Sequence, residues 1–370
     1  MNSKKKTNWS LIIVIILDIV AGLIYSVPIA DSLFDPDNIF SLVIIYLVFI
    51  VSYVIGNYLG VAFHEAGHLV FGLLTGYRLL SYRVGSLLIT KKDGKLVFSR
   101  YSIPGTAGQC LMDRPVDRSN RSYFWYNAGG VIFNLLLVAV VHLVLLLPVP
   151  GFIRCALLVI AFTNWTLVLS NGIPVISSVS NDGMNIVEMS RHPSSITVFQ
   201  NSLEITRKQL EGLRMKDLDD SYILRDDETL YAGGLGFSSL ILLENKLMDL
   251  HEFDKVRDLI KEIREKNYPV LPLHQQYLTI DEKYLDCLEG KYQNDEDKKL
   301  QKLIKAGDSL INVQRFLYAR ALLTGDNELL QKVENNFNKI KKNYPFKGDL
   351  ETELELVEVA KERLSPKEHD

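Results

Sequence analysis

The first half of the chain is built from long apolar runs that short polar stretches separate. A helix needs roughly 20 apolar residues to cross a hydrocarbon core, because every backbone polar group must be paired within the segment. Runs of this length cover 9–28, 40–77, 123–147 and 152–176. We therefore expect four transmembrane helices. The first run also fits a cleaved signal peptide, although Pro28 makes a poor cleavage site.

The pattern changes near residue 190, beyond which the chain is polar and charged. Its apolar residues recur there about every 3.6 positions, which is typical of amphipathic helices. The period predicts helices over 195–216, 229–249, 252–267, 273–290, 295–306, 309–324, 327–342 and 348–364. Segments around Leu242, Tyr284 and Leu322 resemble one another at a spacing of roughly 35 to 39 residues, in the range of two-helix repeats. We expect a TPR-like solenoid or a generic helical bundle.

Between the second and third apolar runs, two short segments of strand-forming residues flank a turn. Ser86–Thr90 and Lys95–Ser99 surround Lys92–Gly94, which predicts a β-hairpin. A hairpin has an unpaired edge, to which an extended peptide can add as a further strand. The expected fold is mainly α, with a polytopic membrane domain (1–190) of four transmembrane helices and a small β-hairpin. A soluble, all-α, partner-binding or regulatory domain (191–370) follows.

Charged residues in the loops predict the orientation in the membrane. The stretch 31–38 contains three aspartates and no basic residue. The loop between the second and third runs instead carries nine basic residues, namely Arg78, Arg83, Lys91, Lys92, Lys95, Arg100, Arg114, Arg118 and Arg121. Because short basic loops stay in the cytoplasm, both termini are expected to be cytoplasmic.

The overall charge indicates which partners to expect, and the loops indicate the cellular compartment. A net charge of −3 over 370 residues argues against a nucleic-acid partner. The short loops and the lack of sorting motifs indicate a multi-pass protein of a bacterial plasma membrane. The partners expected are therefore the lipid bilayer and other proteins.

The first candidate metal-binding residues lie near the cytoplasmic end of the second apolar run. His64 and His68 are four residues apart, so both imidazoles project from one face of a helix and can bind one ion. This spacing around Glu65 is the HExxH pattern of zinc metalloproteases, in which the glutamate takes a proton from a zinc-bound water. A charged residue within a spanning helix is costly, which favours a functional role for Glu65.

A catalytic zinc ion needs a third protein ligand, which must reach the cytoplasmic side of the membrane. Asp113 and Asp117 lie in the basic loop, and His142 is expected to be a polar residue that faces the helix bundle. The best candidate is Asp182, because Pro174 breaks the fourth helix and lets the chain turn a carboxylate back. Asn-Asp-Gly at this point also fits an ordinary turn, so the residues alone leave the choice open.

Together these motifs resemble the site-2 protease family of intramembrane zinc metalloproteases, over about residues 40 to 190. The chain has, in the order of the family, an HExxH motif, a glycine-rich helix start that leads to an asparagine, and an Asn-x-x-Pro…Asp-Gly motif: His64–His68, Asn127–Asn134 and Asn171–Gly183. The resemblance implies that Asp182 is the third zinc ligand and that Asn134 and Asn171 bind substrate. The spacer from Pro174 to Asp182 is longer than the compact form usual in the family.

The function expected from these features is intramembrane proteolysis. Zn²⁺ would be held by His64, His68 and Asp182, and Glu65 would act as the general base. The substrates would be membrane-spanning or membrane-associated proteins or peptides, and a cytoplasmic protein would bind the helical domain. The alternative is a catalytically inactive, membrane-anchored adaptor that binds partners through its helical C-terminal domain.

Overall fold

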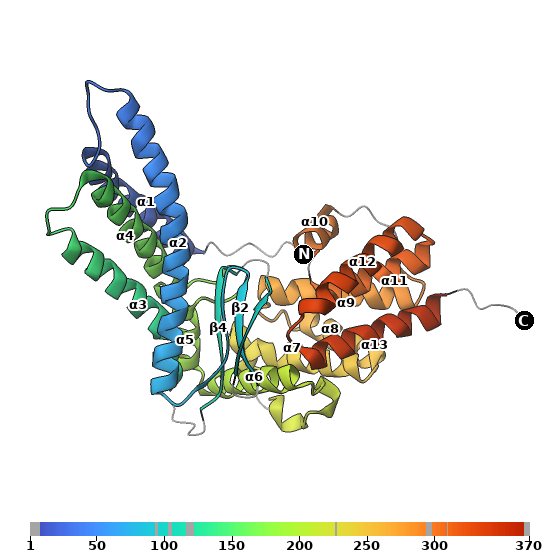
Figure 1. Cartoon of the computed structure of the whole chain (residues 1–370). Coiled ribbons are helices and arrows are strands. Elements are labelled where there is room, and N and C mark those ends of the chain that lie inside the picture. The colour runs from blue at the N-terminus through green and yellow to red at the C-terminus, as the bar shows by residue number, and fades with distance from the viewer. Residues whose placement is uncertain are drawn as a thin grey trace, which may run out of the picture. The chain divides into compact units, whose positions relative to one another are not determined.

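The computed structural model describes residues 8–92, 95–102, 106–115, 122–225, 228–293, 298–308 and 310–365. The chain separates into two compact units. One unit consists of Met1–Phe98 and Ala107–Arg191, and the other of Ser99–Thr106 and His192–Asp370. Figure 1 shows the helices and strands of both units. The expected turn at Asp93 and Gly94 lies outside the described residues.

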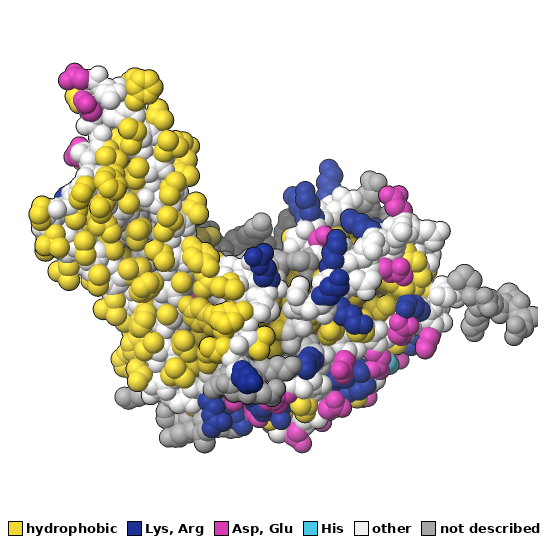
Figure 2. Space-filling model, in the orientation of Figure 1, with side chains coloured by type: hydrophobic (Ala, Val, Ile, Leu, Met, Phe, Trp, Pro, Cys, Tyr) yellow, Lys and Arg dark blue, Asp and Glu magenta, His cyan; other side chains and the backbone are white. Residues whose placement is uncertain are grey.

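The first unit contains four helices that are long and apolar enough to span a membrane, as the sequence predicts. They are α1 (Trp9–Asp31), α2 (Phe40–Leu74), α3 (Ser122–Val144) and α4 (Gly151–Gly172). Hydrophobic side chains cover the visible surface of this unit almost continuously (Figure 2). Such a surface is unusual for a soluble protein and suits contact with lipid.

The helices pack on one another through small and aliphatic residues. Cys155, Val159 and Ala161 of α4 have no exposed surface, and Tyr25 and Ile29 of α1 lie in the same cluster. Helix α2 ends three residues before the expected position, because Thr75 caps it and Gly76 adopts a φ of 90° that reverses the chain. The chain then enters a sheet.

The segment between α2 and α3 forms a four-stranded sheet, whereas the sequence predicts only a hairpin there. Its order is β3 (Lys95–Arg100), β2 (Leu87–Lys92), β1 (Arg78–Val84) and β4 (Gly108–Asp113). β2 and β3 correspond to the expected hairpin, whereas β1 and β4 were not predicted. Strand β1 pairs antiparallel with both neighbours, with Tyr82 opposite Ile89 on one side and Cys110 on the other.

The sheet is attached through this central strand to α2, the helix that carries His64 and His68. The Tyr82 hydroxyl donates a hydrogen bond of 2.5 Å to the carbonyl of Ala62 on α2. The two missed strands escaped the pattern analysis because they lack an apolar–polar alternation. In β4 the consecutive residues Cys110, Leu111 and Met112 are all buried.

A short helix that the sequence analysis missed, α5 (Asp182–Arg191), completes the first unit. The second unit is helical, as expected, and most of its helices begin and end within four residues of the predicted positions. It comprises α6 (Pro193–Glu211), η1 (Met215–Asp217), η2 (Asp220–Tyr222), η3 (Glu228–Ala232), α7 (Gly234–Asp249), α8 (Phe253–Glu265), α9 (Pro272–Leu288), α10 (Lys298–Ala306), α11 (Ile311–Thr324), α12 (Asn327–Asn343) and α13 (Lys347–Leu364).

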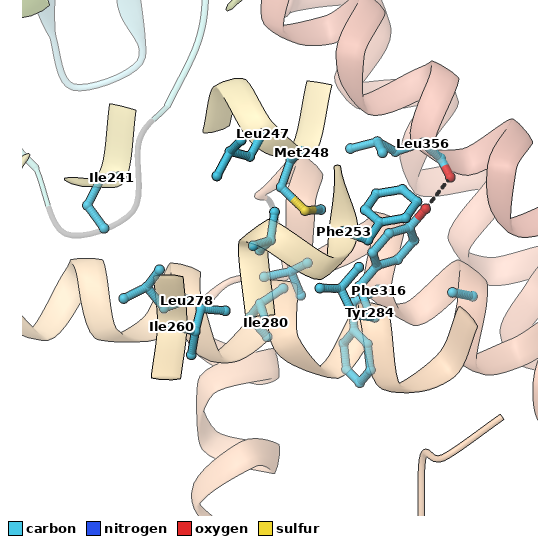
Figure 3. Close-up of a cluster of buried hydrophobic side chains, with 14 of the residues drawn as sticks. Ile241, Leu247, Met248, Phe253, Ile260, Leu278, Ile280, Tyr284, Phe316 and Leu356 are labelled. Carbon is cyan, nitrogen blue, oxygen red and sulfur yellow. Dashed lines mark hydrogen bonds between the residues drawn. The ribbon is translucent and has the colours of Figure 1, made fainter. Parts of the chain in front are cut away.

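One continuous core holds the second unit together. Phe237, Ile280 and Phe316 have no exposed surface, and Tyr284 donates a hydrogen bond of 2.6 Å from its hydroxyl to the carbonyl of Leu356 (Figure 3). These residues come from α7, α9, α11 and α13, so distant parts of the second half share one core. The division into two-helix repeats stays a prediction.

Candidate metal centre

The centre is built on α2, whose closest neighbour at this point is α3. His64, Glu65 and His68 are all at least nine-tenths buried, although they lie in a helix whose other face is exposed and apolar. Helix α3 approaches the histidine face because Gly130 lacks a side chain. A Cβ atom at Gly130 would lie 2.5 Å from Cε1 of His64, closer than any real contact.

The third acidic side chain arrives from α5, of which Asp182 is the first residue. Asn181 directly precedes it and caps the helix, since its Oδ1 accepts a hydrogen bond of 2.9 Å from the backbone N–H of Met184. The same side chain donates to the carbonyls of Ser170 and Ile173 at the end of α4. The long spacer after Pro174 is therefore folded into a closed loop that fixes Asp182.

The ligand atoms of these three residues converge. Oδ2 of Asp182 lies 3.0 Å from Nε2 of His64 and 3.4 Å from Nε2 of His68, and the two Nε2 atoms are 3.1 Å apart. Two atoms bound at 2.0 to 2.1 Å and at the tetrahedral angle lie about 3.3 to 3.4 Å from each other. The three observed separations are close to this value, so the buried His64–His68–Asp182 group could hold a metal ion.

Hydrogen bonds at the far side of each ring determine where its proton lies. Nδ1 of His68 is 2.7 Å from the carbonyl oxygen of Tyr126, which can only accept. Nδ1 of His64 is 2.8 Å from Oδ1 of Asn134. Both Nδ1 atoms therefore carry the proton in the neutral rings, and both Nε2 atoms present lone pairs toward the carboxylate.

Three lone-pair atoms at this distance repel one another unless a positive charge lies between them. Oδ2 of Asp182 is buried and has no hydrogen-bond donor among the described residues. Burial raises the pKa of Asp182, but positive charge at the His68 and His64 pair outweighs it and holds the pKa well below its usual range. Asp182 is therefore ionised at neutral pH, and either a proton on one imidazole or a metal cation must balance it.

Glu65 lies beside the three ligands and is held from the other side by β4. Its carboxylate receives a backbone hydrogen bond from Cys110 and interacts with the charges of His64, His68 and Asp182. A Cβ atom at Gly108 would collide with Oε1 of Glu65, so the strand approaches the carboxylate only because residue 108 is a glycine. Glu65 is thus oriented and 7% exposed.

The two predicted substrate-binding asparagines and the alternative metal ligands lie in different parts of the first unit. Asn134 is fully buried beside His64, and Asn171 near the end of α4 donates a hydrogen bond of 2.9 Å to the carbonyl of Leu167. Substrate binding by either asparagine stays a prediction. His142 bonds through Nε2 to the Tyr25 hydroxyl at 3.1 Å, so it faces the bundle. Asp113 ends β4 and does not belong to the metal group.

Asp117 lies outside the described residues. Within the part of the chain that the structure describes, His64, His68 and Asp182 are the one group of three potential ligands whose atoms converge.

Sequence reasoning missed three residues that support the ligands. Asn181 positions Asp182, the carbonyl of Tyr126 holds His68, and Asn164 of α4 bonds to Asn134. An asparagine followed by a helical pattern is a capping signal, so Asn181 could have been found. No sequence pattern reveals a backbone carbonyl from another helix, and a lone asparagine within an apolar run indicates only a polar contact.

No protein-family model, no curated protein and no solved structure matches this chain significantly. The likeness to site-2 proteases therefore depends on the sequence motifs and on the metal group.

Proposed function

We propose that this chain is an intramembrane zinc metalloprotease of the site-2 protease type, which hydrolyses peptide bonds of membrane-associated proteins or peptides. The observation that carries the proposal is the convergence of Nε2 of His64, Nε2 of His68 and Oδ2 of Asp182 within 3.4 Å of one another. Two histidines and one carboxylate form a donor set that zinc prefers, and three protein ligands leave one position for water or substrate.

A bound zinc ion supplies Lewis-acid chemistry, which activates water near neutral pH and polarises a peptide carbonyl. The chain supplies the base. Glu65 follows His64 directly, is buried next to the ligands and is oriented by the backbone N–H of Cys110. Its role is to take the proton of the attacking water and to pass it to the leaving amine.

The sheet supports a route for the substrate that differs from the expected one. Strand addition was expected at the hairpin, but β3 is the edge farthest from β4 in the order β3-β2-β1-β4. At about 4.8 Å per strand, an extended peptide beside β3 would lie too far from Glu65 to be cut. Strand β4 contacts Glu65 through Gly108, so a substrate strand next to β4 would bring its peptide bond to the base.

The basic residues of the loop between α2 and α3 support a cytoplasmic location for the sheet, and with it both termini in the cytoplasm. The site would then lie at the cytoplasmic side of a cell membrane. The helical second unit would bind a cytoplasmic protein partner or have a regulatory role.

The decisive variant is Glu65→Gln, which keeps the size of the side chain and removes the base. Newly formed peptide termini in membranes that contain the wild-type protein should disappear in Glu65→Gln, while the metal content is unchanged. Asp18→Asn is the matched control, because it removes another carboxylate of a spanning helix, outside the metal group. Identical peptide termini in the wild type and Glu65→Gln would contradict proteolysis and would favour the adaptor.

A further inference from the structure

We propose that Asn164 of α4 is a positioning residue of the metal centre, which acts through Asn134 to fix the ring of His64. The inference deepens the proposed function, since it rests on a metal ion being bound by His64. Asn164 is not adjacent in sequence to any ligand and belongs to none of the motifs described above.

The connection is a chain of buried side-chain amides. Nδ1 of His64 on α2 is 2.8 Å from Oδ1 of Asn134 on α3. Nδ2 of Asn134 donates to Oδ1 of Asn164 at 2.8 Å, and Nδ2 of Asn164 donates to the carbonyl of Ile160 one turn earlier on α4 at 2.8 Å. Neither asparagine has any exposed surface. Three spanning helices therefore meet in one row of hydrogen bonds.

The direction of each hydrogen bond in this row is fixed by its ends. The carbonyl of Ile160 can only accept, so the NH₂ group of Asn164 must point toward it and Oδ1 must point toward Asn134. The second proton on Nδ2 of Asn134 bonds to the carbonyl of Gly60 at 2.9 Å. Oδ1 of Asn134 is then left to accept from Nδ1 of His64, which puts the lone pair of the ring on Nε2, the ligand atom.

Asn164 is important because it prevents the side-chain amide of Asn134 from rotating. With Oδ1 of Asn164 present, a rotated Asn134 amide would place oxygen against oxygen in a site that excludes water. Without Oδ1 of Asn164, one N–H of the Asn134 side chain has lost its acceptor, and a 180° flip of the Asn134 amide costs less. The tautomer and the orientation of His64 would then be less well determined.

His68 has a different support, and this makes the effect specific to His64. Its Nδ1 bonds to the backbone carbonyl of Tyr126, which no side-chain substitution removes. Losses at metal-ligand supports of this kind typically weaken metal binding about 10- to 100-fold. We expect Asn164→Leu to fall in this range although it is two hydrogen bonds from the ligand.

The test compares Asn164→Leu with Thr163→Val in the full-length protein in detergent. Thr163 is the adjacent residue, is equally buried and donates to the same Ile160 carbonyl at 2.9 Å, but it does not bond to Asn134. Zn²⁺ affinity is measured by competition with a chelator, and the ligand field by the visible absorption spectrum of the Co²⁺ form. We expect Asn164→Leu to lose about 10-fold or more in affinity and to alter the spectrum, whereas Thr163→Val matches the wild type.

A double-mutant cycle shows whether the effect passes through Asn134. If it does, Asn164→Leu weakens binding in the wild-type background and adds nothing to Asn134→Leu. Equal affinity of Asn164→Leu and the wild type, or losses that simply add, would overturn the inference.

A further measurement needs no substitution. Histidine ¹⁵N NMR of the Zn²⁺-bound wild-type protein should show His64 as the tautomer that carries its proton on Nδ1 and binds the metal through Nε2. The opposite tautomer would overturn the inference even if Asn164→Leu failed to fold. A wild-type protein that binds no Zn²⁺ would instead refute the proposed function, so the two failures are distinguishable.

Discussion

Nε2 of His64 and Nε2 of His68 lie 3.1 Å apart, and neither carries the proton of its neutral ring. The protons are held on the opposite nitrogens by an amide oxygen from α3 and by a backbone carbonyl of the same helix. With the carboxylate of Asp182 as the third vertex, the site presents only acceptors. It is therefore organised to attract a cation, and it lies in a unit whose four long helices are apolar.

Replacing the carboxylate tests whether the third ligand is correctly identified. Asp182→Asn keeps the shape of the side chain but removes its charge, so Zn²⁺ affinity should fall by more than the roughly 10- to 100-fold typical of lost supporting contacts. Asp113→Asn, which changes a carboxylate outside the metal group, should bind Zn²⁺ as the wild type does. Equal affinities of the two variants would exclude Asp182 as a ligand.

The close approach of α3 predicts a strong effect of a single methyl group. In Gly130→Ala the new Cβ would lie 2.5 Å from the His64 ring, so the ring or the helix must move and metal binding should be lost or reduced at least about 10-fold. Gly22→Ala in α1 is the control, because its Cβ would make ordinary contacts of 3.8 Å. Metal content of the purified variants gives the answer, and an unaffected Gly130→Ala would mean that the helices are farther apart.

Asn181 offers a graded test of the loop that presents Asp182. Asn181→Ala removes both the cap of α5 and the bonds to the end of α4, and a lost cap alone costs about 1 kcal/mol. Asn181→Asp keeps an acceptor for the N–H of Met184 but cannot donate to Ser170 and Ile173. The other carboxylate oxygen would face the carbonyls of Ser170 and Ile173 at about 2.6 Å and be repelled by both, a cost that alanine does not have. Zn²⁺ affinity should therefore decrease in the order wild type, Asn181→Ala, Asn181→Asp, and a flat series would show that the loop does not position the carboxylate.

Some residues of the site could be predicted from the sequence, whereas most of those that position the ligands could not. His64, Glu65 and His68 follow from helical periodicity, since positions i and i+4 share a face whatever the tertiary structure. Asp182 could be only a candidate, because its placement depends on a loop closed by Asn181 and on a helix too short to give a clear period. Asn164 could not be assigned at all, since its partner is 30 residues away on another helix.

The elements of the fold also fall into those that the sequence predicts and those that depend on tertiary contacts. Apolar runs of about 20 residues are sufficient to place the spanning helices, because the membrane permits few alternatives. Strand β4 was not predicted, since the glycine-rich sequence around Gly108 and the run of buried residues that follows it show no apolar–polar alternation. The glycine at 108 reflects contact with Glu65, which is a tertiary requirement that local pattern does not contain.

The helical unit should respond to pH through a buried acidic group. Glu244 has no exposed surface and lies against the carboxyl of Asp281, with Glu353 and Arg315 beside them. Burial, above all, raises the pKa of Glu244 well above its ordinary value and that of Glu353 to about 8. The native state thus keeps protons that the unfolded chain has lost.

The free energy of unfolding should therefore fall as the pH rises from about 4.5 to about 8. Glu244→Gln removes one of these protonation sites and should stabilise the unit at pH 8 by about 1 to 3 kcal/mol, with a smaller effect at pH 5. Glu265→Gln on the surface of α8 is the control. Pulse proteolysis in urea, followed through a C-terminal tag, measures both, and an equal effect of Glu244→Gln at both pH values would contradict the assignment.

The most direct test of the central claim is X-ray absorption at the zinc edge of the purified wild-type protein. The account predicts one zinc ion per chain, with two imidazole nitrogens and carboxylate or water oxygen at about 2.0 to 2.2 Å, and loss of this signal in Asp182→Asn. Protein without zinc, or a thiolate shell at about 2.3 Å, would contradict it.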